Sequence, residues 1–194
     1  MAKGKVITGL DAAANARTGL SAAYAVRAAE LWGWEQYLGD PDNVRELHDM
    51  RIAAKRLRYL FEFYEPALSA DFSAELMKFK RLQDYLGDIH DCDVWVEYLL
   101  EQLRDALKEI NRSRRELSRI NGAQAVLSTG AADLAAVFAG GPAHGLLMFI
   151  AEIADRRTTL YAEFLGYWAE LKAAGFRDRL TGLVDSAVKE GSDG

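Results

Sequence analysis

The sequence predicts an all-α protein, a bundle of six or seven helices in a single domain over residues 1–194. Three observations support this fold class. Alanine and leucine are abundant and proline occurs only three times, a composition that favours helices. Apolar residues recur at helical spacing, and no segment alternates strictly as a half-buried strand does. The chain is also long enough to bury a real core.

The first helix is predicted over residues 9–38, and Arg27 falls within its apolar stripe. An arginine on an inward face either reaches past its neighbours to solvent or lines a polar interior. Residues 39–42, Gly-Asp-Pro-Asp, end this helix and start the next, predicted over 41–64. Glu65-Pro66 is expected to break that second helix.

The second predicted helix carries one histidine and three cations on one face, spaced by three, four and three residues: His48, Arg51, Lys55 and Arg58. Arg56 lies at the edge of this stripe, and the opposite face is apolar. Like charges along about 15 Å of helix repel one another, so solvent, internal carboxylates or an extended anion must offset the cost. Carboxylates are few on this face, and histidine can donate a hydrogen bond to an oxyanion.

The remaining elements are expected in this order: a third helix from Asp71 or Ser73 to about Gly87, a turn at 88–91, a fourth helix to about 120, helices over 123–138, 143–174 and 176–188, and a polar tail at 189–194. Arg157 lies on the inward stripe of the helix over 143–174. A second basic cluster alternates with Glu109 and Glu116 and is interpreted as a solvated face: Arg112, Arg114, Arg115 and Arg119.

Composition excludes several classes of protein. The net charge of −5 argues against a general nucleic-acid coat while permitting a local basic groove. No nucleic-acid partner is expected, because the sequence lacks interleaved exposed aromatic and basic residues. Cys92 is the one cysteine, which rules out an internal disulfide and suits a reducing compartment. Without a signal-type segment or a long apolar run, we expect a cytoplasmic protein with no membrane partner.

Two motifs in this chain resemble the CHAD domain, an α-helical domain named for its conserved histidine. The first is His48, Arg51, Lys55-Arg56 and Arg58-Tyr59. The second, residues 82–91, is similar to the family's Leu-Gln-Asp-x-Leu-Gly signature with its trailing Asp. The resemblance is best over residues 44–100.

This resemblance implies a function, namely binding of inorganic polyphosphate in a basic central groove or pore, with no catalysis and no cofactor or metal. The family's basic motif falls on five residues: His48, Arg51, Lys55, Arg56 and Arg58. Lys80 stands two before the Leu-Gln pair, where the family often has a basic residue. Arg27 and Arg157 would converge on the same channel if the first, second and last long helices pack together.

The chain departs from the family pattern in carrying one clear copy of the basic helix, where the family usually has two. The region from Leu146 to Trp168, which contains Arg156-Arg157, has no matching His-x-x-Arg. A homodimer would supply the second wall of a pore.

Two other functions remain open at this stage. A metal-dependent phosphohydrolase of the HD type would use His48, His90-Asp91 and either Asp133 or Asp155, although the cations beside His48 would repel a divalent ion. A helical interaction scaffold without a small ligand would use the face from Arg112 to Arg119 for docking.

Overall fold

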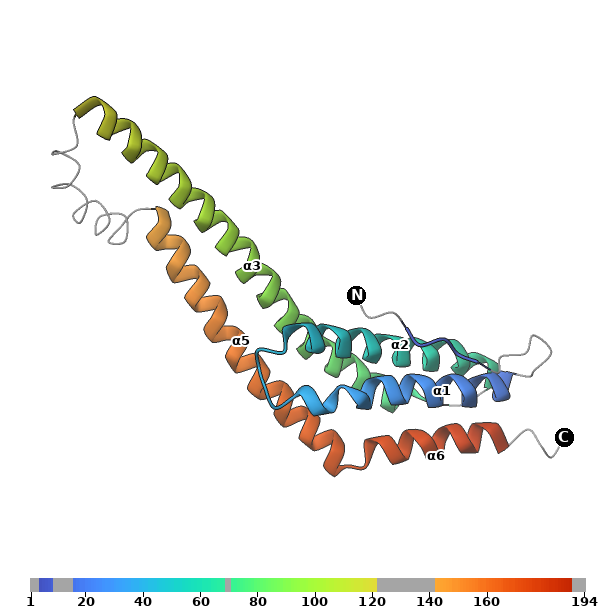
Figure 1. The fold of residues 1–194 in the computed structure, drawn as a ribbon. Helices are drawn as coiled ribbons and strands as arrows, with labels where there is room; N and C mark the ends of the chain where they lie inside the picture. Colours follow the sequence, from blue (N-terminus) through green and yellow to red (C-terminus); the bar gives the residue numbers. More distant parts are fainter. Residues whose placement is uncertain (1–3, 9–15, 69–70, 122–141, 190–194) are drawn as a thin grey trace. The chain divides into compact units, whose positions relative to one another are not determined.

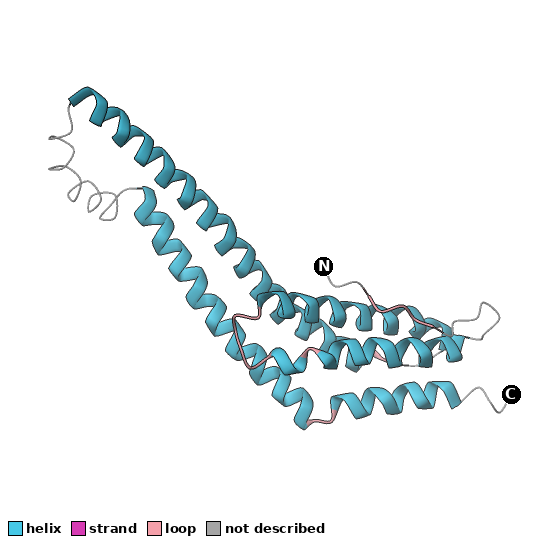
Figure 2. Ribbon diagram, in the orientation of Figure 1, coloured by secondary structure: helices cyan, strands magenta, loops and turns pink. Residues whose placement is uncertain are grey.

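The computed structural model describes residues 4–8, 16–68, 71–121 and 142–189, in which every regular element is helical (Figures 1 and 2). The elements in chain order are α1 (Ala16–Gly33), the 3-10 turn η1 (Glu35–Tyr37), α2 (Val44–Leu68), α3 (Ser73–Asn121), α5 (Pro142–Ala173) and α6 (Phe176–Lys189). The all-α prediction is therefore confirmed for the described residues, which form five α-helices. The helix predicted over 123–138 lies outside them.

The chain divides into two compact units. The first contains residues 1–90 and 159–194, and the second contains residues 91–158. α3 and α5 each contribute residues to both units.

Aromatic side chains fill much of the core of the first unit. Phe61 of α2 lies 4.9 Å from Phe72 and 6.0 Å from Phe79 of α3, measured between ring centroids. Phe79 in turn lies 5.2 Å from Phe176 of α6. All four rings are almost completely buried, and burying such a side chain contributes about 2–3 kcal/mol. α1 completes this core by packing against both α2 and α6.

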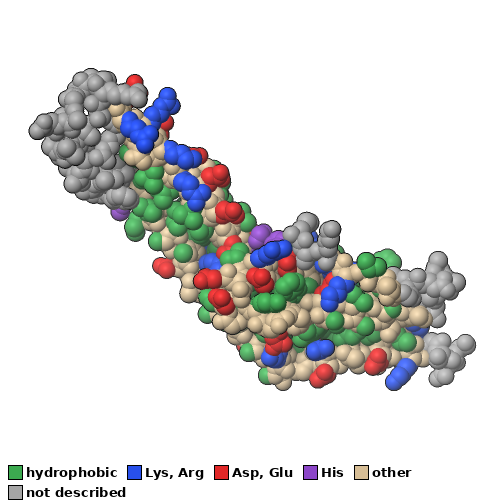
Figure 3. All heavy atoms as spheres, in the orientation of Figure 1, with side chains coloured by type: hydrophobic (Ala, Val, Ile, Leu, Met, Phe, Trp, Pro, Cys, Tyr) green, Lys and Arg blue, Asp and Glu red, His purple; other side chains and the backbone are tan. Residues whose placement is uncertain are grey.

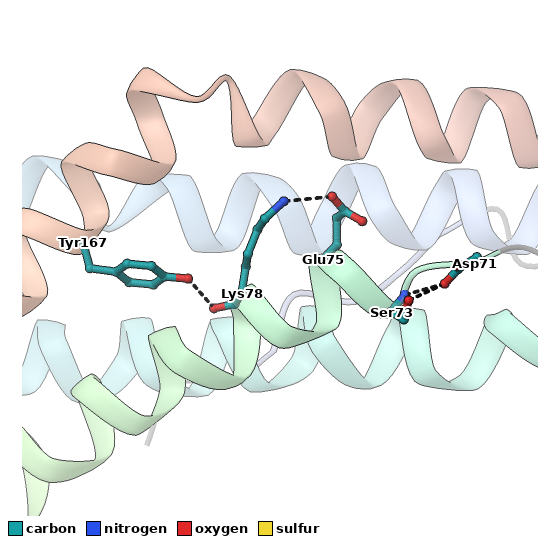
Figure 4. Close-up of polar contacts among 5 residues, drawn as sticks. All are labelled: Asp71, Ser73, Glu75, Lys78 and Tyr167. Atoms are coloured by element: carbon teal, nitrogen blue, oxygen red, sulfur yellow. Dashed lines mark hydrogen bonds and ion pairs between the residues drawn. The ribbon is translucent and has the colours of Figure 1, made fainter.

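The start of α3 is fixed by local polar contacts (Figure 4). The Asp71 carboxylate accepts hydrogen bonds from the Ser73 amide at 2.9 Å and the Ser73 hydroxyl at 2.6 Å, which lowers the pKa of Asp71. Lys78 pairs with Glu75 at 3.1 Å, and the Tyr167 hydroxyl of α5 donates to the Lys78 carbonyl at 3.1 Å. These contacts direct Lys78 along its own helix and tie α5 to α3.

The predicted boundaries of the second, third and fourth helices were wrong. α3 continues through Gly87 and residues 88–91, so the predicted third and fourth helices are one. Leu86 and Ile89, on either side of the glycine, are both buried in the core, and this burial outweighs the roughly 1 kcal/mol that a helical glycine costs. α2 likewise continues past Pro66 and ends two residues later, at Leu68.

The second unit buries few side chains among its described residues: Cys92, Leu99, Leu103, Ala143 and Ile153. Trp95 is 53% exposed. Tyr98, Met148 and Phe149 are also exposed in this unit, and Figure 3 shows apolar side chains beside charged ones on the viewed face of the molecule.

Candidate functional site

The predicted cationic stripe lies along one side of α2. Its members are half-buried or exposed: His48, Arg51, Lys55 and Arg58. The buried residues of α2 lie on a different side and include Met50, Leu57 and Phe61. The helical spacing therefore separates an apolar face from a charged face, as the sequence predicted.

α3 lies against this side of α2 in antiparallel register. The rings of His48 and His90 are 4.6 Å apart between centroids. Three residues further along α2, Arg51 packs against Gly87, where an added Cβ would lie 3.8 Å from the arginine Nε. Thus three residues forward on α2 correspond to three residues back on α3.

By residue spacing, a continuation of this register would put Lys55 level with Gln83 and Arg58 level with Lys80. The α3 residues Lys80, Gln83, Gly87 and His90 repeat the spacing of the α2 stripe, three, four and three. This matching spacing is a sequence signal for which residues of α3 face the α2 stripe, and the α2 motif alone did not reveal them. We call the cations at this seam the basic face: Arg51, Lys55, Arg58 and Lys80.

Carboxylates do little to neutralise the basic face. Within the described residues, Arg51, Lys55 and Lys80 form no ion pair. Arg58 lies 3.3 Å from Glu62, an ion-pair distance without hydrogen-bond alignment at Nε. Lys55 and Arg58 also lie 5.6 and 5.0 Å from the centroid of the Tyr59 ring.

His48 lies at one end of the basic face in an environment that disfavours its charge. Burial lowers its pKa, and the neighbouring His90 and Arg51 lower it further, against an opposite effect of Asp49. Its Nδ1 is buried and has no hydrogen-bond partner among the described residues. An anion bound at this end would favour the imidazolium form.

Two other predicted binding residues, Arg27 of α1 and Arg56 of α2, both lie beside Gly4. Residues 4–8 run across this region: the Lys5 amide donates to Glu30 at 2.5 Å, and Arg27 donates to the Lys5 carbonyl at 3.2 Å. Arg27 also pairs with Glu30 at 2.8 Å. A Cβ at Gly4 would lie 3.1 Å from the Arg56 guanidinium carbon.

Arg56 also lines a cavity of about 310 Å³ with Asp49, Glu30 and residues of α1 and η1. The sequence indicated that Arg56 lies at the edge of the stripe. In the structure it faces this cavity instead. Arg56 and Arg27 belong to a mixed-charge region between α1, α2 and the segment 4–8.

Arg157 belongs to the second unit, where it forms an ion pair with Asp93. Both side chains are 13% exposed. The second basic cluster is in the same unit, and its described side chains, Arg112 and Arg115, are exposed beside Glu109 and Glu116. The interpretation of that cluster as a solvated face agrees with these exposures.

The part of the chain that the structure describes brings together no group of three or more His, Cys, Asp or Glu side chains able to hold a metal ion. Of the two alternative aspartates for the last position of an HD-type site, Asp133 lies outside the described residues and Asp155 lies in the second unit. None of the described helices is both long and apolar enough to cross a membrane.

Comparison with known proteins gives one family match. The family model of the CHAD domain matches residues 9–100, which contain α1, η1, α2 and the first part of α3. No curated protein and no solved structure matches the chain. The matched segment includes both helices that form the basic face.

Proposed function

Because residues 9–100 of this protein are a CHAD domain, we propose that the protein binds inorganic polyphosphate along its basic face, without catalysis by the domain. The observation that supports the proposal is the antiparallel pairing of α2 and α3 at His48 with His90 and at Arg51 with Gly87, whose continuation would put Lys80 level with Arg58. Three of the four cations of the basic face form no ion pair within the described residues.

The chemistry of the ligand fits this arrangement. Polyphosphate is an extended polyanion without bases, so its recognition requires repeated charge-assisted hydrogen bonds to phosphate oxygens. From His48 to Arg58 the α2 stripe extends about 15 Å, which offers donors to several successive phosphates. Phosphate oxygens would also relieve the repulsion among the cations, which internal carboxylates leave largely in place.

The other predicted contacts are secondary in this proposal. Arg27 and Arg157 already pair with Glu30 and Asp93, and Arg56 lies beside the segment 4–8. Each would have to exchange these contacts for phosphate. A homodimer would add a second basic face opposite the first, and light scattering with and without polyphosphate tests that arrangement.

The proposal is tested by titrating polyphosphate into wild-type protein and into an Arg51→Ala/Lys55→Ala variant at several salt concentrations. Each lost phosphate contact removes about 0.7 from the slope of log K against log salt, on the scale of single-stranded polyanions. Four contacts predict a slope of about −3 for wild type, and two predict about −1.4 for the variant.

The matched control is Arg112→Ala/Arg115→Ala, which removes the same charge from exposed positions of the second unit. We expect this control to keep the wild-type slope and nearly the wild-type affinity. Equal losses in both variants would show that polyphosphate responds to net charge and not to the basic face. Circular dichroism of each variant establishes that the helices are retained.

An interaction scaffold is the second candidate, favoured by the exposed apolar side chains of the second unit. Trp95 and Tyr98 on α3 are 53% and 50% exposed, and Met148 and Phe149 on α5 are 59% and 47% exposed. A protein partner bound there would be unaffected by polyphosphate and by the Arg51→Ala/Lys55→Ala change. Competition between the partner and polyphosphate would count against this second function.

A further inference from the structure

One exposed aromatic side chain, Tyr59, lies directly beside the basic face, and a second, Phe63, lies one turn further along α2. Tyr59 is 47% exposed and Phe63 is 74% exposed. Both lie on α2, four residues apart, so they occupy successive turns with Cβ atoms about 5–6 Å from each other. Phe61 lies between them in sequence and is fully buried. Of these three aromatic residues, Phe61 is therefore the one that packs in the core.

The cations of the basic face contact the first of these rings. The Lys55 ammonium and the Arg58 guanidinium lie 5.6 and 5.0 Å from the Tyr59 centroid. Phe63 has one ring contact among the described residues, an edge-to-face contact with Tyr64 at 5.1 Å. The exposed fractions show that much of both rings remains open to solvent.

Bare polyphosphate offers nothing that would use these rings, since it consists of phosphate alone. A single-stranded nucleic acid offers both a phosphate chain for the cations and flat bases for the aromatic faces. The sequence did not indicate that basic and aromatic residues lie together at the surface. The structure corrects that premise, because Lys55 and Arg58 contact the exposed Tyr59 ring, and the exposed Phe63 follows one turn later on α2.

We propose that the basic face also binds single-stranded nucleic acid, with phosphates on Arg51, Lys55, Arg58 and Lys80 and two bases stacked on Tyr59 and Phe63. The inference rests on the proposed function for its phosphate contacts and adds the base contacts. Stacking on a side chain requires an unpaired base, so double-stranded DNA of equal length binds more weakly than a single strand. Stacking is tolerant of sequence, because every base has a flat face.

The test compares three ligands of similar phosphate number at one salt concentration: a thymidine decamer, the same decamer without bases, and polyphosphate. Wild-type protein binds the base-bearing decamer about 100-fold more tightly than the abasic one, which corresponds to about tenfold for each of two stacked bases. Tyr59→Leu and Phe63→Leu each remove about tenfold from the base-bearing decamer and change the other two affinities less than twofold. Tyr59→Trp retains the wild-type preference.

Leucine keeps an apolar side chain of moderate size at positions that are exposed, so both variants are expected to fold, and circular dichroism verifies this. Equal binding of the two decamers by wild-type protein would overturn the inference. So would a parallel loss of all three ligands in Tyr59→Leu, because Tyr59 would then act by positioning Lys55 and Arg58.

Vesicles containing anionic lipid form a further arm of the experiment. If Phe63→Leu weakens binding to these vesicles and leaves the base-bearing decamer unchanged, the exposed rings serve a lipid surface and the inference fails. Failure of the proposed function is read separately, as absence of polyphosphate binding by the wild-type protein.

Discussion

Replacing Gly87 with alanine tests whether α3 is one continuous helix. In a helix interior, alanine is favoured over glycine by about 0.5–1 kcal/mol. The new methyl carbon would lie 3.8 Å from Arg51 Nε, an ordinary van der Waals distance, so no steric penalty offsets this gain. We therefore expect Gly87→Ala to stabilise the protein by about 0.5–1 kcal/mol.

The opposite sign follows if a helix ends at Gly87. A glycine that terminates a helix commonly adopts a left-handed conformation, in which an alanine costs about 1–2 kcal/mol. For a chain of this size, 1 kcal/mol shifts Tm by about 2–4 °C, so the two alternatives are separable by thermal melting followed by circular dichroism. A fall in Tm for Gly87→Ala would refute the continuous helix.

Two other glycines calibrate this measurement. Gly182 lies within α6 with nothing within 4 Å of an added Cβ, so Gly182→Ala is expected to raise Tm by a similar amount. Gly175 has a φ of +63°, so Gly175→Ala is expected to lower Tm. Gly87→Ala should follow Gly182→Ala and not Gly175→Ala.

Three further predictions concern charged and polar contacts. The pKa of His48 is lowered from its ordinary value of 6.5, so the unfolded chain binds the proton at a higher pH than the folded chain does. Stability should therefore fall as pH drops below about 6.5. Thermal melting between pH 7.5 and 5.5 should show a smaller loss of stability in His48→Gln than in the wild type. Asp93→Asn removes the ion pair with Arg157 and should lower the free energy of unfolding, measured by urea denaturation, by about 1–3 kcal/mol. The double variant Asp93→Leu/Arg157→Met should regain part of this loss, because it leaves no unpaired charge. An unchanged urea midpoint for Asp93→Asn would contradict this prediction. Glu65 accepts a hydrogen bond from the Phe72 amide at 3.0 Å, just before α3, so Glu65→Ala should lower the free energy of unfolding by about 1 kcal/mol. Glu65→Gln keeps an acceptor and should retain most of the wild-type stability.

Apolar periodicity predicted the inward faces where several helices surround the core. The face of α2 opposite the cationic stripe was predicted to be apolar, and its residues Met50, Leu57 and Phe61 are all buried. Trp95 recurs at helical spacing with Leu99 and Leu103, which are buried, but is itself half-exposed. The described residues of the second unit come from two helices, α3 and α5, so each covers only a narrow part of the other's apolar stripe, and spacing alone does not show which part.

The charged face of α2 was predictable because it depends on spacing within one helix. Its partner on α3 was harder to predict, because Gly87 and the following aspartates are typical of a helix end. That expectation placed His90 in a turn, and it hid the register that aligns Lys80 with Arg58. The surroundings of Arg27 could not be predicted for another reason. Its side chain donates to the Lys5 carbonyl, and helical periodicity does not relate these two residues.

The attachment of residues 4–8 to α1 has a consequence for how this part of the sequence can vary among homologous chains. Glu30 and Arg27 contact the amide and the carbonyl of Lys5, which every amino acid except proline possesses. Side chains such as Val6, 82% exposed, do not contribute to these two hydrogen bonds. We therefore expect substitutions at Lys5 and Val6 to be nearly neutral in evolution, whereas Gly4 should remain small, because a larger residue must displace the Arg56 guanidinium.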